Sequence, residues 1–170
     1  MDAMIPIGEA APDISLPDLV GRPHRLSHFR RRVVVVNFWS AECPHTTRVD
    51  NEIHQLCCEW GDEVVWVSIA SNANESLDLL RRVAAERALP LVLLDRNHQA
   101  ADCFGAITTP HLFVLDAEGI LRYQGAFDDM TFRQRTPTRN YLAKAVAAVL
   151  AGKKPDPAQT PPYGCTIVRY

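Results

Sequence analysis

Three features are missing from this 170-residue sequence, and each absence narrows its function. There is no excess of basic charge, since the net charge is −2 at pH 7, so the sequence does not favour binding to a nucleic-acid backbone. No apolar run reaches the length of a membrane span, and no basic segment followed by an apolar stretch opens the chain. We therefore expect a cytoplasmic protein that binds neither nucleic acid nor a membrane.

An even set of cysteines is also missing. Five cysteines without a secretion signal fit a reducing compartment, where thiols are structural or reactive rather than paired in stabilising disulfides. The apolar content of 47% is enough for one substantial core. We expect one domain over residues 1–152 and a Pro-rich, extended tail over residues 153–170 that lies on the surface. The oligomeric state stays open.

The sequence alternates buried strands with amphipathic helices. The apolar, β-branched run 33–39 predicts a central strand that is buried on both faces. Further strands are predicted at 63–70, 89–95, 111–116 and 120–125, and the last two form an antiparallel hairpin. Helices are predicted over 44–60, after an N-cap at Asn74, over a short stretch ending near Gly105, and from Thr136 and Pro137 to Gly152. This order predicts an α/β fold with a central mixed sheet flanked by helices.

Cys43 follows the central strand and precedes Pro44, the first residue of the next predicted helix. A thiol at this point lies near unpaired backbone N–H groups and the positive end of the helix dipole, which stabilise a thiolate. Protonated His45 would favour the thiolate further, whereas the carboxylate of Glu42 would oppose it. Ligands of open α/β sheets bind at this edge of the sheet. Cys43 is therefore the candidate nucleophile.

The stretch VVVNFWSAECP, the order of elements and the TTP before a strand resemble the thioredoxin superfamily. The resemblance covers Ile7 to Leu150 and is to the redoxin, or peroxiredoxin-like (alkyl hydroperoxide reductase/thiol-specific antioxidant), branch. That branch has an N-terminal extension and an inserted strand-helix unit, and it includes thiol-disulfide oxidoreductases of cytochrome maturation. The ending GCTI also resembles that of a bacterial thioredoxin-like group. The resemblance implies a thioredoxin-like fold, thiol-based redox chemistry without a cofactor, and a cis bond before Pro110. Thr109 and Pro110, with His45 nearby, would then form the substrate-binding site.

Two departures from the family pattern bear on mechanism. In the motif CPHT, Thr46 stands where a second cysteine would resolve a mixed disulfide. The peroxidase pattern of the family is matched at Ser40 and Cys43, but Val36 occupies its proline position and Pro110 its arginine position. The remaining arginines considered for the site are Arg48 and Arg122.

A catalytic cycle would therefore need a resolving thiol from elsewhere in the chain or from outside it. Cys165 is the first candidate because an extended tail can swing over the site, and Cys103 on the short helix is the second. Cys57 and Cys58 are interpreted as packing and surface residues of the helix at 44–60.

We expect a redox enzyme in which Cys43 exchanges with a disulfide or reduces peroxide, while Ser40 and Thr46 hydrogen-bond near the sulfur. Its partner would be a thiol reductant or a disulfide-bearing protein or peptide. One alternative is a non-catalytic thioredoxin-fold module that binds a peptide or protein, which Thr46 and Glu42 favour. A third hypothesis is metal binding by Cys43, His45 and His111, although their spacing matches no known metal motif. The first hypothesis involves no metal.

Overall fold

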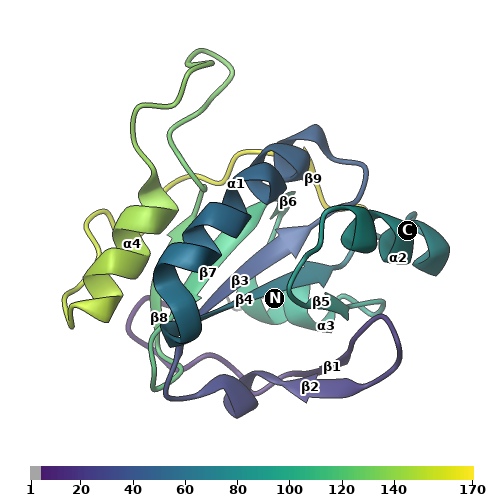
Figure 1. Cartoon of the computed structure of the whole chain (residues 1–170), viewed down its shortest axis with the longest axis horizontal. Coiled ribbons are helices and arrows are strands. Elements are labelled where there is room, and N and C mark those ends of the chain that lie inside the picture. The colour runs from purple at the N-terminus through teal and green to yellow at the C-terminus, as the bar shows by residue number, and fades with distance from the viewer. Residues whose placement is uncertain (1–4) are drawn as a thin grey trace.

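The computed structural model describes residues 5–170 and has an α/β fold (Figure 1). Its nine strands among the described residues are β1 (Ser15–Pro17), β2 (Pro23–Arg25), β3 (Val33–Trp39), β4 (Val64–Ala70), β5 (Val92–Leu94), β6 (Thr108–Thr109), β7 (His111–Leu115), β8 (Leu121–Gly125) and β9 (Cys165–Thr166). The helices are α1 (Pro44–Trp60), α2 (Leu77–Glu86), α3 (Gln99–Phe104) and α4 (Tyr141–Leu150), with 3-10 turns at Leu26–Phe29 and Gly61–Glu63.

The main sheet has the strand order β5-β4-β3-β7-β8. β3 lies in the middle and is parallel to β4 and antiparallel to β7, so the sheet is mixed, as predicted. All seven residues of β3 are buried, because helices and loops cover both faces of the sheet. β5 lies at one edge of the sheet and pairs parallel with β4.

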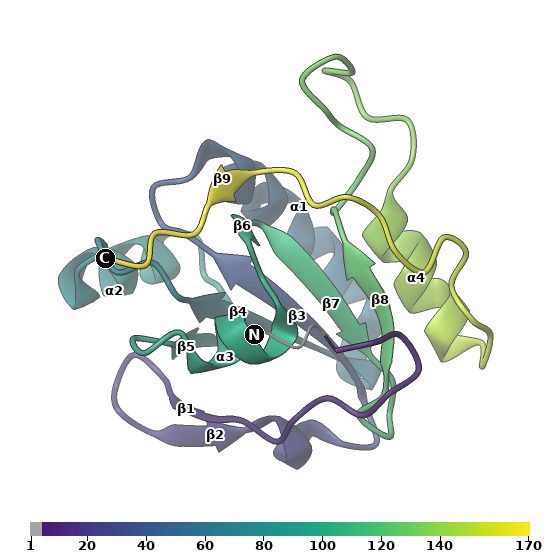
Figure 2. The same cartoon turned by 180° about the vertical axis from the view of Figure 1, so that it is seen from behind.

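Each face of the sheet has its own hydrophobic core. On one face, β3 packs with α1 and α4 through Val35, Val49 and Leu142, and α2 continues this layer at the sheet edge. On the other face, the β1–β2 hairpin and α3 cover the sheet, as Figure 2 shows from behind. Phe104 of α3 packs there edge-on against Phe38 and at a tilt against Phe113.

Three predicted boundaries are wrong. α2 starts after Ser76, whose hydroxyl accepts a bond from Leu79 N at 3.1 Å, so Ser76 rather than Asn74 is the N-cap. α4 starts after Asn140, whose side chain accepts a bond from Ala143 N at 2.9 Å. Thr136 and Pro137 instead belong to an exposed loop. β5 is shorter than predicted and begins two residues after Pro90, which lacks an N–H for the ladder.

The tail is not a loose surface segment, which corrects the prediction for residues 153–170. It runs beside β8, where Thr160 N donates to Gln124 O at 3.1 Å, and then crosses the end of the sheet as β9 (Figure 2). Ile167, in this tail, is only 5% exposed and belongs to the core that contains Phe104. The tail therefore completes one face of the fold.

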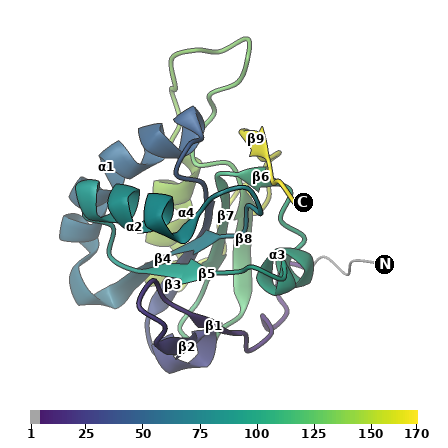
Figure 3. The same ribbon diagram turned by 90° about the vertical axis from the view of Figure 1, so that its right-hand side faces the viewer.

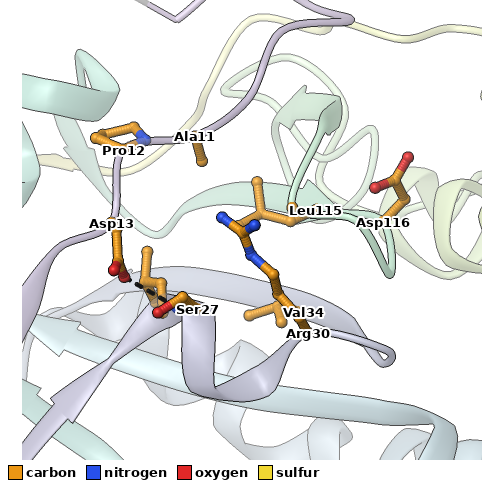
Figure 4. Close-up of a pocket in the computed structure, with 10 residues that line it drawn as sticks. Ala11, Pro12, Asp13, Ser27, Arg30, Val34, Leu115 and Asp116 are labelled. Atoms are coloured by element: carbon orange, nitrogen blue, oxygen red, sulfur yellow. Dashed lines mark hydrogen bonds between the residues drawn. The ribbon is translucent and has the colours of Figure 1, made fainter.

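A small hollow lies between the N-terminal extension and the end of the sheet where β3 begins and β7 ends (Figure 4). Asp13, Arg30 and Leu115 line it, and its volume is about 10 Å³. That is room for about one water molecule, so the hollow is too small for a substrate. Among the described residues, no helix combines the length and apolar character needed to cross a bilayer.

Candidate active site: two thiols beside a cis proline

Cys43 lies where the sequence placed it, after the last residue of β3 and at the N-cap of α1. Its side chain is 4% exposed. The sulfur lies 3.1 Å from the carbonyl oxygen of Thr109, and the Thr109–Pro110 peptide bond is cis, which confirms that expectation. β3, α1 and the chain before β7 thus bring Cys43, Thr109 and Pro110 together.

Cys165 brings a second thiol to the same point. Its sulfur lies 2.9 Å from that of Cys43. Strand β9 pairs antiparallel with β6, so Cys165 lies opposite Thr109 in the ladder. The first candidate for a resolving thiol is therefore held against Cys43 by backbone pairing.

Gly164 explains how β9 approaches so closely. A Cβ atom at this position would lie 2.1 Å from the carbonyl oxygen of Thr109 and 3.0 Å from Cδ of Pro110. A backbone oxygen cannot move out of the way as a flexible side chain can, so any larger residue would push β9 outward. Glycine is required here by the close approach of two backbones.

The segment on either side of Cys165 is anchored at several points, and we call residues 158–169 the strap. Before Cys165, the Thr160 hydroxyl accepts a bond from Ala126 N at 2.9 Å and lies 2.7 Å from the Tyr123 hydroxyl. After it, Val168 N donates to the side chain of Asn72 at 2.8 Å. These contacts fix the strap from both ends, so the position of Cys165 does not depend on the two-residue strand alone.

Ser40 and Thr46 organise the backbone around Cys43 rather than contacting its sulfur. The Ser40 hydroxyl accepts bonds from Cys43 N at 3.2 Å and Glu42 N at 3.3 Å. The Thr46 hydroxyl donates to Ser40 O at 2.5 Å and lies 2.9 Å from Cys43 O. Both hydroxyls thus hydrogen-bond near the sulfur, as expected, and they do so through the backbone of Cys43.

Glu75 is a site residue that the sequence did not reveal. It is 3% exposed, and its carboxylate accepts bonds from the Ser40 hydroxyl, from Ala41 N at 2.9 Å and from the Asn72 side chain at 3.2 Å. The stretch NANES indicated only a helix start. One carboxylate therefore connects the loop before Cys43 to Asn72, which in turn holds the strap.

The two thiols have opposite pKa shifts. Burial opposes ionisation of Cys43, but its hydrogen bond with Cys165 and, after it, the contacts with Thr109 and the backbone of Thr46 outweigh burial and lower the pKa of Cys43. Burial, together with the hydrogen bond to Cys43 and its negative charge, raises the pKa of Cys165 to about 11. Cys43 is therefore the more readily ionised of the two thiols.

The histidines do not assist this thiolate by charge. Burial, and then the charges of Arg48 and Arg135, lower the pKa of His45, and its ring packs edge-on against Tyr163 at 4.9 Å. Burial lowers the pKa of His111 to about 4, and its Nε2 lies 3.0 Å from the Gln124 side-chain oxygen. Both rings are therefore neutral at pH 7.

The metal hypothesis fails on geometry. Across residues 5–170, no three His, Cys, Asp or Glu side chains gather in a way that could hold a metal ion. His111 is also engaged on both ring nitrogens, because Ile107 N donates to Nδ1 at 3.3 Å. Cys43, His45 and His111 are thus not a ligand set.

The other candidates lie elsewhere. Arg48 pairs with Asp128 at 2.5 and 3.1 Å, and Arg122 pairs with Asp116 at 2.8 Å, so neither guanidinium contacts the Cys43 sulfur. Cys103 is half-buried in α3, and its pKa is raised by burial and then by neighbouring carboxylates. Both sulfur contacts of Cys43 are to other residues, so Cys103 does not meet it.

Comparison with known proteins agrees with this geometry. A model of the AhpC/TSA family matches residues 7–124, more than half of the chain. The chain belongs to the AhpC/TSA family. It is 30% identical over 119 residues to the thiol-disulfide oxidoreductase ResA of Geobacillus thermodenitrificans, covering 68% of this chain and 66% of that protein. It is 28% identical to the thiol:disulfide interchange protein DsbE of Allochromatium vinosum, covering 69% and 65%.

The chain spans just under two thirds of the full length of these two relatives. A solved structure, of a hypothetical protein from Sinorhizobium meliloti 1021, matches with a TM-score of 0.87 and 29% identity over 99% of this chain and 96% of that one. The thioredoxin-like fold and the membership of the redoxin branch are thereby confirmed.

Proposed function

We propose that this protein is a thiol-disulfide oxidoreductase in which Cys43 is the nucleophile and Cys165 resolves the mixed disulfide. The observation that carries the proposal is the 2.9 Å separation of the two sulfurs beside the cis proline. Thr46 stands in α1 at the position where a second cysteine is usual, and Cys165 of the strap brings a second thiol from the other end of the chain.

In the first step, the Cys43 thiolate attacks one sulfur of a substrate disulfide. A Cys43–substrate disulfide forms, and the other half of the substrate leaves as a thiolate. Two causes of the high pKa of Cys165, its bond to the Cys43 thiolate and the charge of that thiolate, disappear once Cys43 is bonded. Cys165 then ionises more easily when its attack is needed.

In the second step, the Cys165 thiolate attacks the Cys43 sulfur. The Cys43–Cys165 disulfide forms, and the second substrate thiolate leaves. Both substrate sulfurs are then reduced at the expense of the two protein thiols. The leaving thiolates take up the two protons that the protein thiols release.

Disulfide rather than peroxide chemistry is favoured by the arginines. Peroxidases of this family orient peroxide with a guanidinium, whereas Arg48 is held by two bonds to buried Asp128. Strand β9 occupies the edge of β6 on which an extended peptide would dock, so peptide docking there, in the non-catalytic alternative as in the enzyme, requires the strap to move aside.

Cysteine mapping tests the proposal. The reduced protein is treated with a small disulfide, quenched with acid at intervals, and digested for mass spectrometry. We expect modification of Cys43 first, then a Cys43–Cys165 disulfide, while Cys57 reacts slowly because burial raises its pKa. Cys165→Ser should accumulate the mixed disulfide at Cys43, and Cys43→Ser should abolish turnover. Equal labelling of Cys43 and Cys57 would remove the enzymatic proposal.

A further inference from the structure

The loop between β8 and α4 projects from the body of the molecule (Figure 1). All nine residues 131–139 are exposed. The carboxylate of Asp129 nevertheless orders the loop, accepting bonds from Thr138 N at 2.8 Å, the Thr138 hydroxyl at 2.7 Å and Gln134 Nε2 at 2.8 Å. These bonds lower the pKa of Asp129, so the support is in place at neutral pH. The loop is a built projection, and we call residues 130–139 the cationic arm.

The arm has a distinct chemistry. It contains Arg133, Arg135 and Arg139 and no acidic residue, although the whole chain has a net charge of −2. Phe132 is 81% exposed, so an ordered segment presents an aromatic ring to water. Arginine and aromatic residues are the types most enriched at the centres of protein interfaces.

The arm stands beside the thiol pair. Its base is tied to α1 by the ion pair between Arg48 and Asp128. The charge of Arg135 contributes to the lowered pKa of His45, which is two residues from Cys43. Figures 1 and 3 both show the arm rising from the end of the sheet at which β6 and β9 lie. A macromolecule bound to the arm would therefore also lie next to the thiols.

We propose that the cationic arm docks an acidic protein that carries the dithiol which reduces the Cys43–Cys165 disulfide. The inference rests on the proposed function, because that cycle leaves an internal disulfide that needs an external reductant. Cys165 is half-buried whereas Cys43 is 4% exposed, so Cys165 offers the more accessible sulfur. A protein partner is favoured over a membrane or a nucleic acid, since only a thiol-bearing partner gains from binding beside this disulfide.

The reaction balances within the pair of proteins. One partner thiolate attacks the Cys165 sulfur, forming an intermolecular disulfide and releasing the Cys43 thiolate. The second partner thiolate attacks the partner sulfur in that bond and releases Cys165. The partner leaves as a disulfide, and two electrons and two protons have moved from it to Cys43 and Cys165.

Two synthetic dithiol peptides serve as probes. Both contain the core Cys-Gly-Pro-Cys, flanked in one by Asp and Glu and in the other by Asn and Gln. Each reduces the oxidised protein in stopped flow, and each rate constant is divided by that of the same variant with dithiothreitol. The variants are Arg133→Glu/Arg135→Glu, Phe132→Ser and a matched charge reversal at exposed, distant positions, Arg22→Glu/Arg82→Glu.

We expect the wild-type protein to react about tenfold faster with the acidic peptide than with the neutral one at low salt. Raising the salt to about 0.5 M should remove most of this preference. Arg133→Glu/Arg135→Glu should abolish or reverse it, Phe132→Ser should slow both peptides alike, and Arg22→Glu/Arg82→Glu should keep the preference.

Equal rates with the two peptides, or an unchanged preference in Arg133→Glu/Arg135→Glu, would overturn the inference. So would arm-dependent binding to phosphatidylglycerol vesicles or to an oligonucleotide without any peptide preference. If the proposed function is wrong, the result is different. No Cys43–Cys165 disulfide forms on oxidation, so dithiothreitol itself gives no reduction of the protein.

Discussion

Gly164→Ala tests whether the strap positions the resolving thiol. The added Cβ would lie 2.1 Å from Thr109 O, so β9 must retreat by roughly 1 Å to reach an ordinary contact distance. The retreat breaks the β6–β9 pairing and the bond from Ile167 N to Ile107 O, now 3.0 Å. Two or three backbone bonds at about 1 kcal/mol each give about 2–3 kcal/mol in favour of the open strap. The ratio of closed to open strap should then fall about 30- to 160-fold.

The assay follows resolution directly. In a background with Cys57, Cys58 and Cys103 replaced by alanine, an aromatic disulfide that releases a coloured thiolate is mixed with the reduced protein. The first thiolate is released when Cys43 is modified, and the second when Cys165 displaces the remaining half. We expect Gly164→Ala to slow the second phase by up to about 160-fold and to leave its amplitude intact.

Gly152→Ala is the matched control. Gly152 is constrained by its backbone angle, with φ at 72°, whereas a Cβ there would have no neighbour within 4 Å. The control should lose about 1 kcal/mol of stability without slowing the second phase. If Gly164→Ala resolves within about twofold of the parent protein, the close approach of Gly164 to Thr109 does not control the reaction and the reasoning is wrong.

Three further predictions concern groups around the site. Cys165→Ala should raise the pKa of Cys43, because it removes a donor to the thiolate; titration of thiolate absorbance at 240 nm would contradict this if the pKa stayed or fell. Glu75→Gln should lower the free energy of unfolding by about 1–3 kcal/mol in urea, because the amide N–H₂ would face one of the two donors, Ser40 or Ala41; wild-type stability would refute it. The pKa of His111 is about 4 in the folded state but near 6.5 in the unfolded chain, so the unfolded chain binds the proton first as the pH is lowered. The free energy of unfolding should therefore decrease by up to about 3 kcal/mol between pH 6.5 and pH 4. His111→Gln should remove most of that slope in urea titrations at several pH values.

The place of Cys43 in the fold and the cis proline could be predicted from sequence because each depends on a local pattern. A β-branched run followed by Cys43 and Pro44 specifies a thiol at a strand end and a helix start. Thr109 and Pro110 precede a second apolar strand, and the resemblance supplied the cis bond. The main sheet follows from the same runs, since seven buried residues in succession leave β3 only a central place.

The strap could not be placed in this way. Its pairing with β6 joins residues 56 and 58 positions apart through a strand of two residues, and the prolines before it indicated only an extended chain. Glu75 was missed because a buried carboxylate is recognisable only when its donors are known, and these come from Ser40, Ala41 and Asn72. Asn140 was overlooked because Thr136 and Pro137 form an equally good local start signal.

The position of the second thiol also changes what oxidation does to the fold. In a dithiol motif within one helix turn, a disulfide closes a loop of about four residues. The entropy that this loop removes from the unfolded chain corresponds to about 2 kcal/mol of stability. Cys43 and Cys165 are 122 positions apart, and closing that loop corresponds to about 5 kcal/mol. Oxidation would lock the strap across β6 and restrain most of the chain, whereas reduction would leave the strap held only by its hydrogen bonds and the packing of Ile167. Under the proposed function, Thr46 in place of a second cysteine leaves the resolving role to Cys165, and oxidation of this distant pair couples the redox state of the site to the stability of the domain.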